Sequence, residues 1–165
     1  MLSTIDRKKH PLFVLSASAG SGKTYQLVLE YLSILLRTPS AIKYKSIVAI
    51  TFTNKASLEM KTRIIDALFE LSKFDIAHSD KKTNSIVLEL KKIIGISERE
   101  IIIRSRKALT GILHGYENFN VSTIDKFNLR LIKSFSNDLE LPNDFEISLN
   151  EKEVLEEVLD LLLSS

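Results

Sequence analysis

The chain has 165 residues, of which 44% are hydrophobic and 27% charged, as in one ordinary globular domain or part of one. Its net charge of +2 indicates no general attraction to nucleic acid. The absence of cysteine excludes disulfides, thiolate metal sites and cysteine nucleophiles. Because the N-terminal residues lack an apolar signal core and no uncharged apolar run reaches the roughly 20 residues of a membrane span, we expect a cytoplasmic protein without a membrane partner.

The first predicted elements are a strand, a loop of small residues and a helix. The apolar run Leu12–Leu15 predicts the strand, and the helix extends from Lys23 to Arg37, where Pro39 prevents easy continuation. The loop between them is Ala17-Ser18-Ala19-Gly20-Ser21-Gly22-Lys23-Thr24. A strand that ends in such a loop and continues as a helix brings backbone N–H groups and a helix N-terminus to one point, which suits bound phosphate.

This loop is typical of sites that bind ATP together with Mg²⁺. Lys23 would reach the β- and γ-phosphates, Thr24 would place its hydroxyl on Mg²⁺, and Gly20 and Gly22 would let the backbone come close to the anion. The first residue of the loop is alanine where the usual pattern has glycine. The alternative is a plain strand-to-helix turn with an incidental lysine, but the flanking strand and helix favour a phosphate-binding loop. Tyr25 is expected to pack as an aromatic at the start of the helix, and stacking near a nucleotide is the alternative.

The next predicted unit repeats this layout of strand, polar turn and helix. Ser46–Phe52 is short and apolar, as in a parallel strand that is covered on both faces, and it indicates a doubly wound α/β sheet. Thr53 and Asn54 then cap a helix that has an apolar stripe on one side and charges on the other. The stripe consists of Ala56, Met60, Ile64, Leu68 and Leu71, and the outward residues are Lys55, Glu59 and Asp66.

Residues of about 72–116 are predicted to form a helical insertion that packs on the edge of the sheet. The polar segment from Ser72 to Asn84 is typical of a surface loop. A helix of about Ser85 to Ile94 would stop at Gly95. A second helix would begin with the capping box Ser97-Glu98-Arg99-Glu100 and end near His114-Gly115.

The remaining chain is predicted to add a strand, a helix, a half-exposed strand and a final helix. The strands are Phe119–Ile124 and Asp144–Leu149, and the helices begin at Asp125 and near Asn150. The first of these helices has an apolar side with Phe127, Leu131 and Phe135 and a basic side with Lys126, Arg130 and Lys133. The basic side suits either a solvated face or a binding stripe.

Polar side chains gather where two of the predicted strands end. At the carboxyl end of the first strand and the start of the next helix they are Thr51, Thr53, Asn54 and Lys55, and at the end of the second strand they are Ser122, Thr123 and Asp125. In an open parallel sheet, the carboxyl ends of the strands form the edge where ligands bind. Hydroxyls, an amide, helix N–H groups and a cation suit the sugar–phosphate backbone of DNA, but an ordinary capped turn has the same residues. The spacing alone leaves both interpretations open.

Three segments together resemble a known family. In order and spacing, residues 17–24, 50–63 and 121–127 resemble motifs I, Ia and Ic of superfamily 1 DNA helicases of the UvrD/RecB type. The resemblance is nearest to the RecB and AddA branch, which also opens directly on an Ala-Ser-Ala-Gly loop without a glutamine-bearing adenine motif. That branch often has Asp in the third motif where UvrD-like members have His, and Asp125 stands at this position.

The resemblance implies the N-terminal part of the first RecA-like domain of an ATP-dependent 3′-to-5′ DNA translocase that acts in DNA repair and recombination. The implied fold is an α/β P-loop NTPase with a parallel sheet and flanking helices, in which residues 1–143 belong to the RecA-like domain and 144–165 begin a 1B-like subdomain. Carried over by position, the loop 17–24 binds ATP, Lys23 and Thr24 are catalytic, and Thr24 also holds Mg²⁺. The positions that match DNA contacts are Thr53, Asn54, Lys55, Ser122, Thr123 and Asp125.

The chain departs from this family after the third motif. The family continues to a strand ending in Asp-Glu, which completes the metal site and activates the attacking water, and then to a second RecA-like domain. Asp138-Leu139 and Asp160-Leu161 lack the glutamate and do not substitute for it. We therefore expect a segment of a longer helicase that is inactive by itself and has an incomplete sheet. Its expected partners are single-stranded or duplex-end DNA, the rest of the helicase chain and a second, AddB/RecC-like subunit.

Two other functions stay open from the sequence alone. A small P-loop nucleotide kinase would need acidic or arginine segments for its acceptor and a lid, which we do not find in the sequence. A truncated module could use the same three segments to bind single-stranded DNA or a protein without hydrolysing ATP. Salt-dependent DNA binding without ATP turnover would favour the module.

Overall fold

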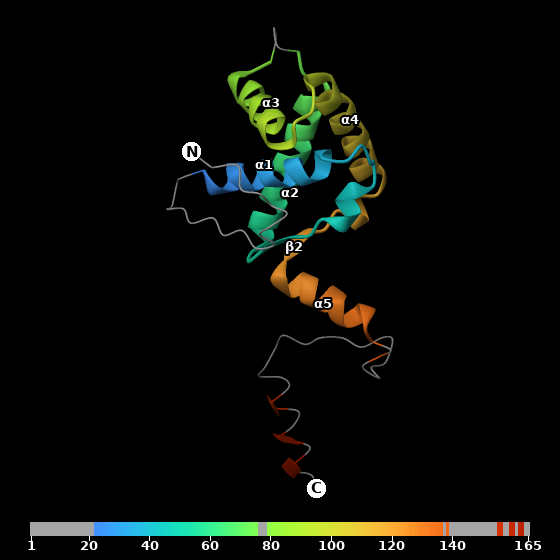
Figure 1. Ribbon diagram of the computed structural model, residues 1–165. Helices are drawn as coiled ribbons and strands as arrows, with labels where there is room; N and C mark the ends of the chain where they lie inside the picture. Colours follow the sequence, from blue (N-terminus) through green and yellow to red (C-terminus); the bar gives the residue numbers. More distant parts are fainter. Residues whose placement is uncertain are drawn as a thin grey trace. The chain divides into compact units, whose positions relative to one another are not determined.

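The computed structural model describes residues 22–75, 79–136, 138, 155–156, 159–160 and 162–163 (Figure 1). The chain forms two compact units, Met1–Thr123 and Ile124–Ser165. The first contains α1 (Lys23–Leu36), η1 (Lys43–Ser46), β1 (Ala49–Thr51), α2 (Asn54–Ser72), α3 (Lys81–Ile94), α4 (Glu98–His114), η2 (Tyr116–Asn118) and β2 (Val121–Thr123), and the second contains α5 (Ile124–Ser134). The strands predicted at 12–15 and 144–149 lie outside the described residues.

The sheet of the described residues is parallel, as predicted. β1 pairs with β2 in a register that places Ala49 opposite Val121, Ile50 opposite Ser122 and Thr51 opposite Thr123. Parallel neighbours need a long crossover connection, and α2, α3 and α4 provide it here. The expected α/β class with a parallel sheet and flanking helices is therefore confirmed, although the described fold is mostly helical.

Both strands are shorter than predicted, and β1 is not covered on both faces. Ser46 ends a 3₁₀ helix, and Phe119 follows another one, so neither belongs to a strand. Ala49 packs against the core, whereas Ile50, whose side chain points to the opposite face, is 47% exposed. The prediction that this strand is covered on both faces, which rested on the apolar run Ser46–Phe52, is therefore wrong. Helix α2 packs against the strands, but Ile50 stays outside the core.

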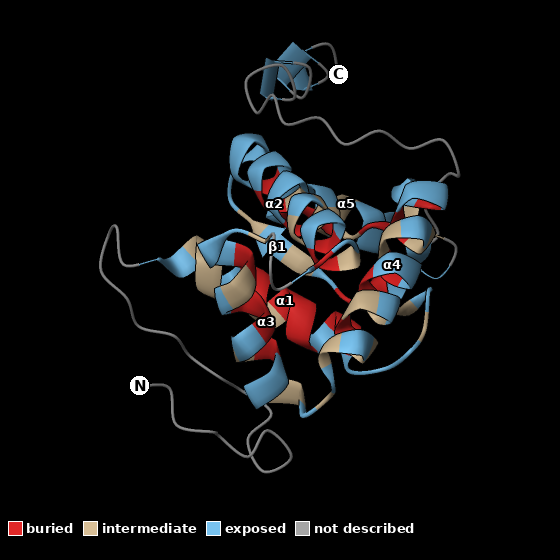
Figure 2. Ribbon diagram, turned by 90° about the horizontal axis from the view of Figure 1, so that it is seen from above, coloured by how far each residue is buried: buried red, intermediate tan, exposed pale blue. Residues whose placement is uncertain are grey.

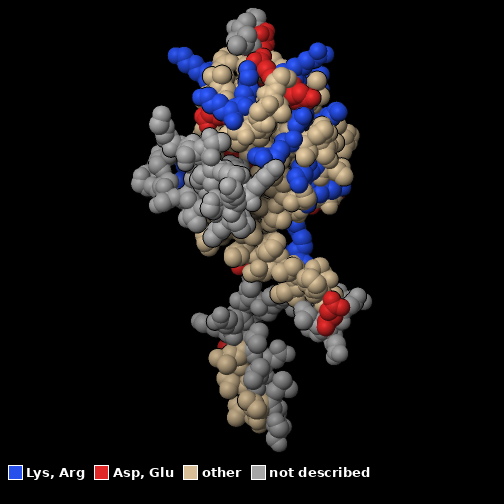
Figure 3. Space-filling view, in the orientation of Figure 1, with Lys and Arg blue, Asp and Glu red and all other residues tan. Residues whose placement is uncertain are grey.

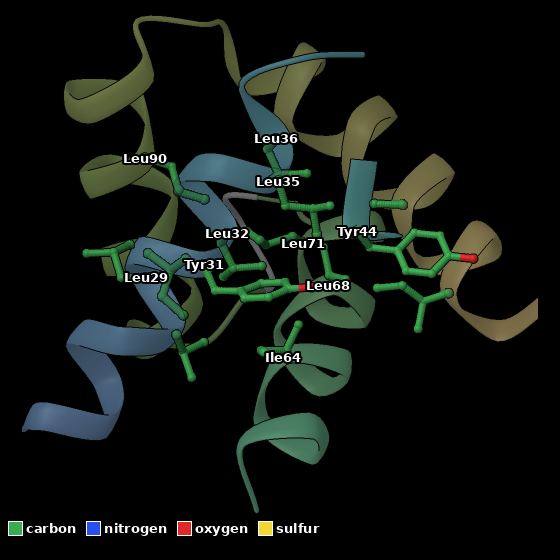
Figure 4. Close-up of a cluster of buried hydrophobic side chains, with 14 of the residues drawn as sticks. Leu29, Tyr31, Leu32, Leu35, Leu36, Tyr44, Ile64, Leu68, Leu71 and Leu90 are labelled. Atoms are coloured by element: carbon green, nitrogen blue, oxygen red, sulfur yellow. The ribbon is translucent and has the colours of Figure 1, made fainter. Parts of the chain in front are cut away.

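Helices α1 to α4 surround one hydrophobic core. In Figure 2 the buried residues, drawn in red, line the facing sides of these helices. Figure 4 shows leucines of α1 meeting Ile64, Leu68 and Leu71 of α2 and Leu90 of α3. The core holds the helices together, and none of the described helices is both long and apolar enough to cross a lipid bilayer.

The apolar stripe of α2 is confirmed except at its first position. Met60, Ile64, Leu68 and Leu71 are buried, but Ala56 is exposed and Ser57 is buried in its place. A strict four-residue repeat drifts around a helix that has about 3.6 residues per turn, and Ser57 lies closer than Ala56 to the centre of the buried side. The Ser57 hydroxyl is satisfied because it donates to the Asn54 carbonyl at 2.8 Å.

The helices of the predicted insertion have the expected caps, with one earlier start. α3 begins at Lys81 and not at Ser85, because Asp80 caps it by accepting from the Thr83 N–H at 2.7 Å. α3 ends at Gly95, as predicted. α4 begins at the predicted cap, where Ser97 accepts from the Glu100 N–H at 3.2 Å. We expected this pair at the edge of the sheet, and the structure packs α3 and α4 against α1 and α2.

The second unit contains the predicted basic helix. α5 begins at Ile124, one residue before the predicted start. Its basic residues Lys126, Arg130 and Lys133 are exposed, and so are Leu131 and Phe135 of its apolar side. Where the final predicted helix is described, at 155–156, 159–160 and 162–163, the residues are helical.

Replacing Leu68 by alanine should reveal how much stability the core provides. Leu68 is fully buried, so Leu68→Ala should lower the free energy of unfolding by about 2 to 5 kcal/mol, through lost burial and a residual cavity. Leu58 is the control because it lies on the same helix but is 63% exposed, and Leu58→Ala should change that free energy by less than about 0.5 kcal/mol. Urea unfolding followed by circular dichroism measures both, and equal losses would contradict a core centred on Leu68.

Candidate functional site

The first candidate position is the start of α1. Gly22 precedes the helix in the left-handed conformation, with φ of 79°, which a residue without a Cβ adopts at little cost. Its carbonyl accepts the first helical bond, from the Gln26 N–H at 3.0 Å. Lys23, which is exposed, and Thr24, which is partly buried, occupy the first turn. An α-helix leaves its first N–H groups without partners in the helix, so this turn can present them to an anion.

This start fits a bound triphosphate as far as the structure describes it. A left-handed glycine, a lysine and a threonine at a helix N-terminus supply close backbone approach, a cation and a hydroxyl. The other predicted positions of the loop, Ala17, Ser18, Ala19, Gly20 and Ser21, lie outside the described residues.

The second candidate position is the shared end of β1 and β2. Because Thr51 lies opposite Thr123, the two strands end side by side. The Thr51 hydroxyl lies 3.1 Å from the Thr53 carbonyl and 3.5 Å from the Ser122 carbonyl. One side chain therefore connects the turn after β1 to the backbone of β2, across 71 positions of sequence.

The predicted residues at this edge differ in accessibility. Thr53, Asn54 and Lys55 are exposed at the start of α2, where a ligand can reach them. Ser122 and Thr123 are only 8% and 5% exposed, so they hold the strand in place rather than offer their side chains to solvent. Asp125 is exposed in the first turn of α5, which belongs to the second unit. The structure thus brings the residues 51–55 and 122–123 together, whereas Asp125 belongs to the second unit.

Sequence reasoning missed Phe52 as a residue of this edge. It was counted as the end of a covered strand, yet 88% of it is exposed between Thr51 and Thr53. An exposed aromatic ring beside hydroxyls, an amide and a lysine can stack on a nucleic acid base while its neighbours contact the backbone. The signal in the sequence was an aromatic residue at the edge where ligands were expected.

Tyr25 connects the first turn of α1 to α3. Its hydroxyl donates to Glu89 Oε1 at 3.2 Å, and the Ser85 hydroxyl donates to the same oxygen at 3.4 Å. Burial raises the pKa of the Tyr25 phenol, a hydrogen bond with Ser85 lowers it, and the negative charge of Glu89 raises it further. The phenol therefore keeps its proton and remains a donor at neutral pH. The ring packs against the core, as predicted for an aromatic at this helix start.

Charge alone does not mark the site. Figure 3 shows Lys and Arg side chains in blue and Asp and Glu side chains in red interspersed over the visible face of the helical part. This distribution agrees with the small net charge of the chain. The candidate site is therefore defined by local geometry at the strand ends and at the start of α1.

Comparisons with known proteins point to one family. Residues 3–164 match the model of the UvrD/REP helicase N-terminal domain. The chain is 33% identical over 148 residues to an ATP-dependent helicase/nuclease subunit of Lactobacillus acidophilus, covering 89% of this chain and 10% of that protein. It is 32% identical over 133 residues to the RecBCD enzyme subunit RecB of Borreliella burgdorferi, covering 80% of this chain and 10% of that protein. No solved structure matches the chain.

Thr53 should contribute to stability through its cap, whatever ligand it contacts. The Thr53 hydroxyl accepts from the Ala56 N–H at 3.1 Å, so Thr53→Ala should lower the free energy of unfolding by about 1 kcal/mol. Thr53→Ser keeps the hydroxyl and should retain most of that free energy. Urea unfolding of the three proteins measures the difference, and equal stability of Thr53→Ala and the unchanged chain would mean that the cap contributes nothing.

Proposed function

The chain belongs to the UvrD/REP helicase N-terminal domain family, and from this membership we propose that it is the ATP-binding N-terminal segment of an ATP-dependent DNA helicase that translocates 3′ to 5′ in DNA repair and recombination. The family match confirms the resemblance that the three sequence segments indicated, and the RecB and helicase/nuclease relatives confirm the branch. The chain spans about a tenth of the length of these relatives, so translocation belongs to a longer protein in this proposal.

One structural observation carries the proposal. The parallel register of β1 and β2 places the second and third sequence segments at the same end of the sheet, and the Thr51 hydroxyl joins them. Thr51 and Thr123 end the two strands side by side, as a strand of DNA that contacts both segments would require.

The nucleotide would be held at the start of α1. Lys23 would bind the β- and γ-phosphates, Thr24 would coordinate Mg²⁺ through its hydroxyl, and the conformation of Gly22 would let the backbone approach the phosphates. Bound ATP with Mg²⁺ would supply the free energy for translocation through its hydrolysis. The residues of this chain bind and orient the triphosphate, and the groups that activate water belong to the remaining part of the helicase.

Single-stranded DNA would lie along the shared end of β1 and β2. Thr53, Asn54 and Lys55 are exposed and would contact the sugar–phosphate backbone, while Phe52 would stack on a base. Ser122 and Thr123 would support the strand end from inside. The half-exposed Ile50 on β1 would be covered by the rest of the helicase chain, and a second AddB/RecC-like subunit is the further proposed partner.

Removing the Lys23 ammonium should separate nucleotide binding from DNA binding. Lys23→Ala should weaken the binding of Mg²⁺-ATP by about 10- to 100-fold, because a charged hydrogen bond to the phosphates is lost, and should leave the affinity for single-stranded DNA unchanged. Lys91→Ala, an exposed lysine near the end of α3, is the matched control and should change neither. Titration with a fluorescent ATP analogue measures the binding, and equal affinity of Lys23→Ala and the unchanged chain would refute the nucleotide site.

Variants of Lys55 and Phe52 should separate the electrostatic contribution to DNA binding from the stacking contribution. Lys55→Ala should reduce the slope of log K against log salt by about 0.7 for single-stranded DNA, because one phosphate contact is lost. Phe52→Ala should weaken binding by about 1 to 3 kcal/mol without changing that slope, because stacking is lost. Lys92→Ala on α3 is the control, with no change in either quantity. Fluorescence anisotropy over a salt series measures both, and an unchanged slope for Lys55→Ala would exclude a phosphate contact there.

A further inference from the structure

The helical insertion contacts the nucleotide-binding helix at its first turn. Tyr25 follows Thr24 directly, and its hydroxyl reaches across to Glu89 of α3 at 3.2 Å. The two residues are 64 positions apart in the sequence, so this bond is a tertiary contact and not a feature of the helix itself. Tyr25 lies in the same helical turn as Lys23 and Thr24, so a restraint on its position also restrains theirs.

The acceptor on α3 is arranged to receive this bond. Ser85 lies one turn before Glu89 and donates to the same carboxylate oxygen at 3.4 Å, which limits the orientations of that carboxylate. The contact is partly buried, so water competes less for the Tyr25 hydroxyl than it would at an exposed surface. The bond to this acceptor therefore restrains the position of the Tyr25 hydroxyl.

The other end of α1 is held by the same insertion. Arg104 of α4 donates to the carbonyls of Leu36 and Arg37 at 2.9 and 2.8 Å, and its Nε donates to Glu100 at 3.1 Å. A cation at the last carbonyls of a helix satisfies acceptors that have no partner within the helix. α1 is thus fixed at its first turn by α3 and at its last turn by α4.

We propose that Tyr25 and Glu89 are a positioning pair, through which the helical insertion sets the orientation of the first turn of α1 and so the affinity for Mg²⁺-nucleotide. The pair acts through Lys23 and Thr24 and does not touch the nucleotide. This inference rests on the proposed nucleotide site, and it adds that α3 is a functional part of that site. The ring of Tyr25 contributes to the core, whereas its hydroxyl serves the positioning.

Two tyrosine variants test the pair. Tyr25→Phe keeps the ring and removes the bond to Glu89, and it should raise the Kd for Mg²⁺-ATP by about three- to tenfold, the effect of one hydrogen bond. Tyr44→Phe is the matched control, because Tyr44 donates to the Gly115 carbonyl at 3.2 Å across 71 positions and does not belong to α1. It should lower stability without changing the Kd. Equal changes of Kd in both variants would mean general loosening and would overturn the inference.

Variants of Glu89 separate positioning from charge. Glu89→Gln keeps an oxygen that can accept from Tyr25 and should leave the Kd within about twofold, whereas Glu89→Ala should raise it as Tyr25→Phe does. The double variant should lose no more affinity than either single variant, because both remove the same contact. Additive losses would show that the two residues act independently and would contradict the pair.

Hydrogen exchange provides a measurement without nucleotide. Exchange of the Gln26 amide, whose hydrogen bond to the Gly22 carbonyl closes the first turn of α1, should become faster in Tyr25→Phe and Glu89→Ala, and should stay unchanged in Tyr44→Phe. Unchanged exchange together with unchanged Kd in Tyr25→Phe would refute the pair and leave the nucleotide site intact. If the unchanged chain and Lys23→Ala bind Mg²⁺-ATP equally, the proposed function fails instead, and the exchange rates still decide whether Tyr25 and Glu89 fix the turn.

Discussion

The parallel pairing of β1 with β2 is the constraint on which the rest of the structure depends. Each strand has only three residues, so their backbone hydrogen bonds alone could not hold two segments whose paired residues lie 72 positions apart. Helix α2 leaves β1 and packs against both strands, and α4 returns along α2 toward β2. The buried faces of these helices therefore set the register, and the register in turn brings the carboxyl ends of the two strands to one edge.

Much of this fold could be predicted from local patterns in the sequence. The N-cap residues Thr53 and Ser97 and the stop at Gly95 were identified correctly, because a cap is a property of a few neighbouring residues. The extent of the strands could not be predicted in the same way. Apolar residues such as Ile47 and Phe119 are buried without belonging to a strand, and only the position of the partner decides where pairing begins and ends. The start of α3 was missed because Asp80 stands in a polar segment whose composition is also typical of a loop.

The candidate site shows the same division between local and distant causes. The order of residues placed Thr53 to Lys55 and Ser122 to Thr123 at strand ends, and the parallel register agrees with this. Their accessibility follows from packing between distant segments, which buries Ser122 and Thr123 and leaves Phe52 in solvent. An aromatic residue that stands between two threonines could equally have filled the core. The exposure of Phe52 is set by the tertiary structure, and so is the hydrogen bond from Tyr25 to Glu89.

Polar contacts as well as apolar ones connect α1 to the insertion, and the two kinds restrict the helix in different ways. Its leucines anchor the middle of the helix in the core, but apolar contacts are non-directional and would tolerate a small rotation or slide of the helix. Hydrogen bonds have preferred distances and angles, so bonds at both ends restrict such movement. Arg104 and Glu89 supply these bonds from two different helices of one insertion. In the proposed nucleotide site this restriction would hold Lys23 and Thr24 in place, because a turn that binds phosphate needs donors that converge on one point.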